Sequence, residues 1–369
     1  MLLLIPGPVT TRPEVRAAAA QDYAPWDLDF RALVRRVNDG VLAVAGGRSS
    51  EHAALPLQGC GHFAVEAAVR SLVPLGGRLL LPMTGQYAGS LARLAREAGR
   101  EVAELTVPQD APVEPDRVEA ALRADPTLTH LAVIYSETST GVVHPAPQLA
   151  AAAARAGRRV IVDAVSAFGA LPFDLAALPA VDAVAFTTNK GLEGLPGAAF
   201  VVARVDRLTE GRAGSWSLDL ADIYAATLDR PGSSRFTPAA GVLAALDVAL
   251  DLLAAEGGPP ARLARYRANQ ETLCDGMRAL GLRPMLAAAA QGPVVVNVAA
   301  PEGPGWTLQR FVDMLKMRGF LISNFDCTPE PSFRVGCIGA VEPDDMRRAV
   351  AAMGDVLAEM DALPRREAA

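Results

Sequence analysis

Residues 160–163 read Val-Ile-Val-Asp, and residues 183–197 read Ala-Val-Ala-Phe-Thr-Thr-Asn-Lys-Gly-Leu-Glu-Gly-Leu-Pro-Gly. Both stretches begin with an unbroken apolar run rather than with alternating apolar and polar residues. Such runs are typical of parallel strands that helices cover on both faces of a sheet. The first run ends in Asp163, and Lys190 follows the second. Each predicted strand therefore places one ionisable group near its carboxyl end, where α/β proteins bind ligands.

Further strands and helices alternate on both sides of these stretches. Short β-branched and leucine-rich runs between alanine-rich helical segments indicate a doubly wound, mostly parallel α/β sheet. The predicted strands are 78–81, 101–107, 131–135, 160–163, 183–187 and 198–203, and the predicted helices between them are 63–72, 90–98, 114–123 and 148–156.

The character of the sequence changes after about residue 238. Long helices are predicted over 241–255 and 262–280, with a Glu-Gly-Gly-Pro-Pro breaker at 256–260 between them. Strands at 294–298, 320–323 and 332–335 and helices at 308–318 and 344–360 follow. We therefore predict two domains: a large α/β domain over 14–255, and a small α+β domain formed by 256–369 together with the N-terminal segment 1–13.

Composition and charge argue against several classes of protein. The net charge of −6 makes an extended nucleic-acid backbone an unfavourable partner. No apolar run is long enough for a membrane span, and no basic segment precedes the apolar N-terminus, so a signal peptide is not expected. Four cysteines without paired spacing indicate a reducing cytoplasm, and four histidines without ligand spacing argue against a metal site.

Lysine is almost absent from this chain. Lys190 and Lys316 are the only lysines, which leaves 33 of the 35 basic residues as arginine. Codon bias explains the scarcity, but arginine cannot replace lysine as an amine nucleophile because it stays protonated. A partly buried lysine has a lowered amine pKa, which suits Schiff-base chemistry. Lys190 is therefore a candidate nucleophile, and the alternative is an ordinary surface charge.

Residues 58–66 read Gln-Gly-Cys-Gly-His-Phe-Ala-Val-Glu and place two glycines before a predicted helix. Glycines let backbone N–H groups approach an anion, and a helix N-terminus favours negative charge, so this segment could cradle a phosphate. The segment also fits a relaxed dinucleotide fingerprint, but no Asp or Glu lies between Glu66 and Glu97 to hold a ribose. A tight turn without a ligand is the remaining alternative.

A phosphate cradle, a carboxylate and an amine are together what pyridoxal phosphate requires. In that interpretation Asp163 keeps the pyridine nitrogen protonated, and Lys190 holds the cofactor and shuttles protons. Tyr87 follows a strand and could stack on the ring, with core packing as its alternative. Arg334 lies alone between apolar residues. It is a candidate clamp for a substrate carboxylate, or else a surface charge.

On these residues and eight motifs, the chain resembles the class-V, fold-type I pyridoxal-phosphate-dependent aminotransferases, and among them the 2-aminoethylphosphonate–pyruvate transaminase family. The resemblance runs from Pro6 to about Met360. The motifs are Pro-Gly-Pro-Val-Thr-Thr (6–11), Trp-Asp-Leu-Asp (26–29), Leu-Gln-Gly-Cys-Gly (57–61) with Ala-Val-Glu (64–66), Ser-Glu-Thr-Ser-Thr-Gly (136–141), Asp-Ala-Val-Ser-Ala-Phe-Gly (163–169), Asn-Lys (189–190) with Gly-Leu-Pro-Gly (194–197), Arg-Phe-Thr (235–237) and Phe-Arg-Val-Gly-Cys-Ile-Gly (333–339).

The resemblance implies a role for each matched residue. Lys190 forms the internal aldimine with the cofactor, and Asp163 meets the pyridine nitrogen. Arg334 binds the carboxylate of pyruvate or alanine. Thr237 reaches the cofactor phosphate of the partner subunit, which implies a homodimer with shared active sites. The other implied cofactor-binding residues are Cys60, Gly61, His62, Tyr87, Thr138, Val165 and Asn189. A phosphonate dianion needs cationic or N–H donors, and the candidates for this are Thr10 and Arg235.

The implied reaction converts 2-aminoethylphosphonate and pyruvate into phosphonoacetaldehyde and alanine. Its partners are a small-molecule amino donor and a keto acid, without nucleic acid, membrane or metal. The Gly-Cys-Gly-His cradle (59–62) departs from the Gly-Ser-Gly-Ser more usual in the family, and Gly241 replaces a family threonine. An alanine- or serine–glyoxylate aminotransferase, a related lyase, and a protein that binds the cofactor without turnover are the alternatives.

Overall fold

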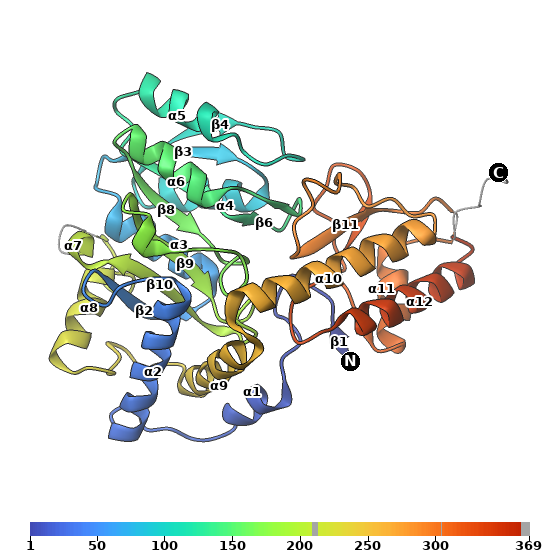
Figure 1. The fold of residues 1–369 in the computed structure, drawn as a ribbon, viewed down its shortest axis with the longest axis horizontal. Coiled ribbons are helices and arrows are strands. Elements are labelled where there is room, and N and C mark those ends of the chain that lie inside the picture. Colours follow the sequence, from blue (N-terminus) through green and yellow to red (C-terminus); the bar gives the residue numbers. More distant parts are fainter. Residues whose placement is uncertain (209–212, 304, 363–369) are drawn as a thin grey trace.

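A seven-stranded sheet forms the centre of the larger part of the molecule, in the order β2-β10-β9-β8-β5-β3-β4 (Figure 1). The computed structural model describes residues 1–208, 213–303 and 305–362. Five adjacent strands are parallel, and β10 runs antiparallel to both β9 and β2. The predicted α/β class with a mostly parallel sheet is confirmed. The strands are β2 (His52–Gly59), β3 (Arg78–Met83), β4 (Glu101–Thr106), β5 (His130–Ile134), β8 (Arg159–Asp163), β9 (Val181–Thr187) and β10 (Gly197–Arg204).

Helices cover both faces of this sheet, which explains its continuous apolar runs. Val160 and Val162 of β8 join the hydrophobic cluster on one face, and Ile161 joins the cluster on the other. Successive side chains of a strand point to opposite faces, so a strand buried on both faces needs apolar residues throughout. The first face is covered by α2 (Leu28–Val44), α5 (Pro115–Ala124), α6 (Ala146–Arg155) and α9 (Ala240–Glu256), and the second by α3 (Gly61–Leu72), α4 (Gln86–Glu97) and α8 (Leu220–Asp229).

A separate hydrophobic cluster occupies the region drawn in orange and red in Figure 1. Its core strands are β11 (Val295–Ala299) and β13 (Ser332–Gly336), which pair antiparallel. The N-terminal strand β1 (Leu2–Leu3) pairs with β12 (Phe320–Leu321), so the N-terminal segment belongs to this region. The helices are α10 (Gly258–Ala279), α11 (Leu308–Met317) and α12 (Pro343–Glu359). The separate cores support the division into domains 14–255 and 1–13 with 256–369, which remains our proposal.

The connection between α9 and α10 is tighter than predicted. α9 ends at Glu256, and Gly257 adopts a φ of 110°, a backbone conformation that favours glycine. α10 begins directly at Gly258, with Pro259 and Pro260 in its first turn. Proline fits there because the first N–H groups of a helix have no intrahelical acceptor. The predicted helix start at residue 262 is therefore wrong.

The remaining elements are short. They are α1 (Pro13–Ala18), β6 (Ser136–Glu137), β7 (Val142–Val143), the 3₁₀ helix η1 (Leu175–Ala177) and α7 (Val205–Leu208). Across the described ranges, no helix has the length and apolar character required to cross a membrane.

Candidate active site

The carboxyl ends of four strands meet at one edge of the large sheet. β2 and β9 both pair antiparallel with β10, so they run in the same direction. β8 pairs parallel with β9, and β3 has the same direction because it pairs parallel with β5, which pairs parallel with β8. This is the edge at which open α/β sheets bind ligands. The segments that follow β2, β3, β8 and β9 bring together Cys60, Tyr87, Asp163 and Lys190.

A cavity of about 210 Å³ lies at this edge. Eight of its lining residues are ones that the sequence predicts for the cofactor: Cys60, Gly61, His62, Tyr87, Asp163, Val165, Asn189 and Lys190. The other lining residues are not predicted, and they are Gly7, Val65, Ser90, Leu91, Leu94 and Thr187. Gly7 comes from the N-terminal segment, and a Cβ there would lie 2.9 Å from Cγ of Lys190. Any larger residue at position 7 would therefore displace the lysine side chain.

Lys190 lies in the connection between β9 and β10. Burial lowers the pKa of its amine to about 8; the negative charge of Asp163 opposes this effect, and the positive charge of Arg334 adds to it. An amine with such a pKa is roughly one-tenth neutral at pH 7, compared with well under one-thousandth for an ordinary lysine. Lys190 can therefore act as a nucleophile near neutral pH, as the sequence predicts.

Asp163 is buried at the end of β8. Among the described residues, the one hydrogen bond to its carboxylate comes from the N–H of Val165, at 2.9 Å. The pKa of Asp163 is raised to about 7, mainly by burial and also by the charge of Glu137, while the N–H of Val165 and the charge of Lys190 oppose the shift. A buried carboxyl group that faces a cavity without an ion pair is suited to a cationic ligand atom, such as a protonated ring nitrogen.

The segment before α3 has the form of an anion cradle. Gly59 has a φ of 127°, and a Cβ at this position would lie 2.6 Å from the ring of Phe63. A Cβ at Gly61 would lie 2.5 Å from Cγ2 of Val165. Cys60 precedes the helix and makes no side-chain cap, so the first N–H groups of α3 can bind an anion. These observations fit a phosphate group at this end of the cavity.

Glu137 holds the start of α4 and is not predicted as a site residue. Its carboxylate is fully buried and accepts hydrogen bonds from the N–H groups of Tyr87 and Ala88, each at 3.4 Å. It also accepts bonds from the hydroxyl of Ser139 (2.5 Å) and its N–H (3.1 Å). Burial raises the pKa of Glu137. The carboxylate thus fixes the backbone of Tyr87, whose ring lies 6.0 Å from that of His62.

Arg334 is buried on β13. Its Nε donates to the hydroxyl of Ser323 at 3.1 Å, and its Nη1 donates to the carbonyl of Thr138 at 3.3 Å. The guanidinium carbon lies 4.3 Å from the ring centre of Phe325. Within the part of the chain that the structure describes, no carboxylate forms an ion pair with Arg334. A buried cation without a counter-charge is costly, so this arginine is suited to bind an anionic substrate.

Five predicted site residues are not among those that line the cavity. Two of them, Thr138 and Arg334, are joined by the hydrogen bond described above, and the other three make contacts elsewhere. The hydroxyl of Thr10 accepts a hydrogen bond from the N–H of Leu3 at 2.7 Å. Arg235 forms an ion pair with Asp222 and lies over the ring of Trp216. The carbonyl of Thr237 accepts a hydrogen bond from the Gln58 side chain. The roles of Thr10, Arg235 and Thr237 toward a substrate or a partner's cofactor stay predictions.

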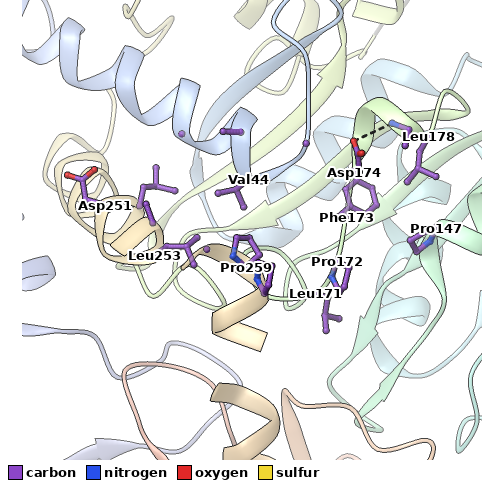
Figure 2. A pocket seen from close by; sticks show the side chains of 18 of the residues that line it. Val44, Pro147, Leu171, Pro172, Phe173, Asp174, Leu178, Asp251, Leu253 and Pro259 are labelled. Atoms are coloured by element: carbon purple, nitrogen blue, oxygen red, sulfur yellow. Dashed lines mark hydrogen bonds between the residues drawn. The ribbon is translucent and has the colours of Figure 1, made fainter. Parts of the chain in front are cut away.

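A larger cavity, of about 880 Å³, lies between α2, the end of α9 and the segment around Phe173 (Figure 2). Its lining is mainly apolar, as the side chains of Leu171, Pro172 and Leu253 illustrate. The described residues around it include no lysine, histidine or cysteine. Its ionisable lining residues are Arg36, Asp174, Asp247 and Asp251. No amine lies among them, so this cavity cannot support the Schiff-base chemistry expected at Lys190. In the described ranges, no group of three or more His, Cys, Asp or Glu is placed to hold a metal ion.

Comparison with known proteins gives concordant matches. Residues 30–317 match the family described as aminotransferase class-V. The 2-aminoethylphosphonate–pyruvate transaminase of Burkholderia ambifaria (strain MC40-6) is 44% identical over 358 residues, which cover 96% of this chain and 95% of that protein. The enzyme of the same name from Pseudomonas putida (strain W619) is 43% identical, with 98% of each chain covered. The crystal structure of a Thermus thermophilus aspartate aminotransferase superposes with a TM-score of 0.84 at 27% identity, covering 98% of this chain and 100% of that one.

Proposed function

The chain belongs to the class-V aminotransferases, and we propose that it moves the amino group of 2-aminoethylphosphonate to pyruvate, giving phosphonoacetaldehyde and alanine. The proposal rests mainly on one observation: Lys190, Asp163 and the glycine cradle all line one cavity. In addition, relatives named 2-aminoethylphosphonate–pyruvate transaminase match this chain over nearly its whole length.

The cofactor of this family, pyridoxal 5'-phosphate, supplies an electron-accepting ring and an aldehyde that binds amines. The residues present fit this group. The N–H groups at the start of α3, flanked by Cys60 and Gly61, would hold the phosphate. Asp163 would hold the proton on the ring nitrogen, and Tyr87 would cover one face of the ring. Lys190 would hold the aldehyde carbon.

The proton transfers follow from the position and pKa of Lys190. With the cofactor bound, the neutral amine of Lys190 would take a proton from the amino-bearing carbon of the donor as general base and would release it again as general acid. In the second half of the reaction the same amine performs the reverse transfer, so that alanine is formed from pyruvate. Asp163 would be kept ionised by a protonated ring nitrogen placed against it. The pKa of about 8 keeps the Lys190 amine able to accept and release a proton near neutral pH.

Arg334 is proposed to bind the pyruvate carboxylate, and replacing it with alanine tests this role. The KM for pyruvate should rise at least about tenfold in Arg334→Ala, since a charge-assisted hydrogen bond contributes roughly 1.5–3 kcal/mol. Arg334→Lys should give a partial effect because an ammonium group cannot bind a carboxylate in the bidentate manner. Steady-state kinetics measures both values, with Arg283→Ala as a control, because Arg283 forms an exposed ion pair with Glu330. An unchanged KM in Arg334→Ala would remove this residue from the carboxylate site.

The identity of the donor can be tested from the absorbance of the yellow, cofactor-loaded protein. Addition of 2-aminoethylphosphonate without pyruvate should bleach the lysine-bound absorbance within one turnover, because the amino group is transferred to the cofactor. Alanine should bleach it through the reverse reaction, and serine should not. If alanine or serine bleaches the absorbance and 2-aminoethylphosphonate does not, the proposed donor is wrong and a glyoxylate-type aminotransferase is favoured.

We further propose a homodimer located in the cytoplasm. The segment around Thr237 supports the dimer: it contacts Gln58, beside the cradle, and exposes the aromatic side chain of Trp216 next to Phe236. A second chain that covers this surface would remove the exposed ring of Trp216 from water. The cytoplasmic location is supported by the four cysteines, all of which are free thiols.

A further inference from the structure

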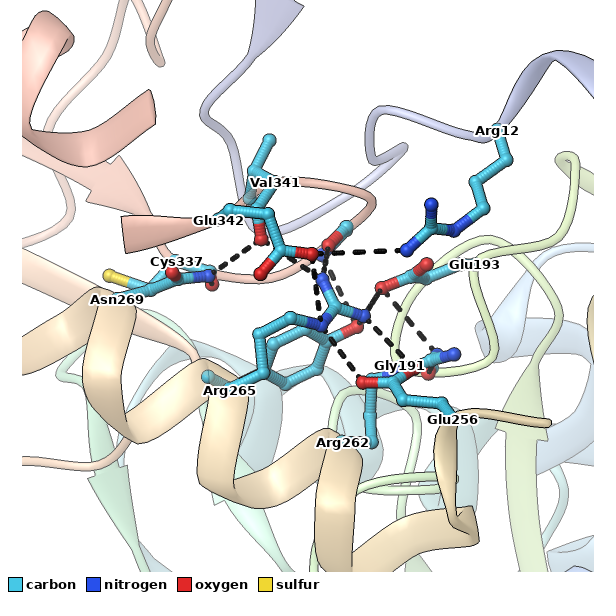
Figure 3. Close-up of polar contacts among 12 residues, drawn as sticks. Arg12, Gly191, Glu193, Glu256, Arg262, Arg265, Asn269, Cys337, Val341 and Glu342 are labelled. Carbon is cyan, nitrogen blue, oxygen red and sulfur yellow. Dashed lines mark hydrogen bonds and ion pairs between the residues drawn. The ribbon is translucent and has the colours of Figure 1, made fainter. Parts of the chain in front are cut away.

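A cluster of charged side chains lies against the connection that carries Lys190 (Figure 3). We call it the Glu193 cluster, and its members are Glu193, Glu256, Arg262, Arg265 and Tyr266. Arg262 is buried, and its Nη1 donates to the carbonyl of Gly191, the residue after Lys190, at 2.7 Å. The Nε of Arg262 donates to Glu256 at 2.7 Å. One buried guanidinium thus fixes the backbone directly after the lysine.

Glu193 fixes the same connection from its other end. Its N–H donates to the carbonyl of Lys190 at 2.8 Å, and its φ is 58°, a conformation that residues other than glycine rarely adopt. Its carboxylate accepts hydrogen bonds from Arg265 at 2.7 Å and from the hydroxyl of Tyr266 at 2.8 Å. Glycine would adopt this backbone conformation with less strain. Glutamate is therefore explained by its side chain, whose carboxylate makes these two hydrogen bonds.

The cluster also reaches the segment that follows Arg334. The Nη1 of Arg265 donates to the carbonyls of Gly339 (2.7 Å) and Val341 (2.9 Å). The hydroxyl of Tyr266 accepts a hydrogen bond from the N–H of Gly339 at 3.2 Å. Gly339 lies shortly after β13, the strand of Arg334. The same few side chains therefore join the Lys190 connection to the strand that carries Arg334.

We propose that Glu193 is a positioning residue for the reaction: through Arg265 and Tyr266 it sets the place of the Lys190 amine relative to Arg334. The inference rests on the proposed roles of Lys190 and Arg334. A buried ionic cluster gains little net stability, because desolvation offsets most of the attraction between its charges. Its hydrogen bonds do fix geometry, and proton transfer depends steeply on the placement of the base.

Two variants of Glu193 separate the carboxylate from the backbone conformation. Glu193→Gly keeps the favourable φ and removes both side-chain bonds, whereas Glu193→Gln keeps a neutral acceptor. The measurement is kcat for transfer from 2-aminoethylphosphonate to pyruvate, divided by the number of Lys190 sites labelled by borohydride reduction. We expect kcat per labelled site to fall about tenfold or more in Glu193→Gly and a few-fold in Glu193→Gln. The rate at which cofactor-free protein captures pyridoxal 5'-phosphate should fall in the same order.

Asp361 provides a matched control, since it is the other described non-glycine residue with a positive φ, at 53°, and it is exposed. Asp361→Gly should leave kcat per labelled site and the capture rate unchanged. The positioning role is wrong if Glu193→Gly also leaves kcat per labelled site and the capture rate unchanged. It is also wrong if total activity falls only as much as the number of labelled Lys190 sites. Tyr266→Phe, which removes a single hydroxyl, tests the same contact if Glu193→Gly does not fold. Wild-type protein without label at Lys190 would instead refute the proposed function.

Discussion

Lys190→Ala is expected to lower kcat by about 10⁴-fold, the upper range for loss of a general acid–base group. The amine has two tasks in the proposed reaction, holding the cofactor and moving the proton, and no other described lysine or histidine side chain is placed to take over both. Stopped-flow absorbance after mixing with 2-aminoethylphosphonate measures the remaining rate. A small added amine such as methylamine should restore part of it, because the space left by the side chain adjoins the cavity.

The chain offers a matched control for this experiment in Lys316, which is exposed on α11. Lys316→Ala should retain wild-type kcat. Borohydride reduction of the loaded protein, followed by peptide mapping, should label Lys190 and leave Lys316 without label. Label on any residue other than Lys190, or an active Lys190→Ala protein, would contradict the central role of this amine.

Asp163→Asn is expected to change activity and stability in opposite directions. Loss of the carboxylate opposite the ring nitrogen should lower kcat by about 10²–10³-fold, as loss of one preorganised electrostatic contact does. The cofactor-free variant should nevertheless be more stable than cofactor-free wild type at pH 8. Burial raises the pKa of Asp163 from 3.8 to about 7, so an ionised Asp163 costs the empty protein about 4 kcal/mol.

The sign of this effect depends on pH in a defined way. Well below pH 3.8 both the folded and the unfolded protein carry a protonated Asp163, and the group does not change the free energy of unfolding. As the pH rises toward 7, the unfolded chain releases this proton while the folded chain retains it, so the stability contribution of the group decreases and is lowest above pH 7. Thermal unfolding of both cofactor-free proteins at pH 5 and pH 8 should show a gap of several degrees at pH 8 and a smaller one at pH 5.

Asp182 is the matched control for the stability measurement, because it is buried at the start of β9 and paired with Arg159, whose Nε lies 2.7 Å from its carboxylate. Its pKa is lowered, because the hydrogen bonds and charge of Arg159 and the ring of His130, whose Nε2 lies 3.5 Å away, overcome the effect of burial. Asp182→Asn should therefore lower the unfolding temperature at pH 8. If both substitutions changed the unfolding temperature at pH 8 equally, Asp163 would not be a buried carboxylate that lacks a counter-charge in the cofactor-free protein.

The sequence predicts most of the large sheet because its strands follow a local pattern. The edge strand β2 is not predicted, since Pro56 interrupts it. Pro56 is tolerated because β2 has a neighbour on one side only, so a missing N–H need not break a pairing on the other. The helix α2 is also not predicted, although its buried residues Phe30, Val34, Val37 and Val41 have helical spacing.

The same distinction between local and distant information applies to the site. Asp163, Lys190 and the cradle are predicted because each lies at the end of a recognisable strand or the start of a helix. Gly7 and Glu193 are not, because their roles come from contacts with residues far along the chain. A short sequence motif carries no signal for such contacts. Glu137 is intermediate: it belongs to the Ser-Glu-Thr-Ser-Thr-Gly motif, but its bonds to α4 become visible only in the fold.

The scarcity of lysine has a practical consequence for handling the enzyme. Amine-reactive resins and dyes can attach to Lys316, which is exposed on α11. Lys190 is shielded from such reagents while it holds the cofactor. Immobilisation through lysine should therefore attach the molecules through the same surface, with Lys190 left unmodified.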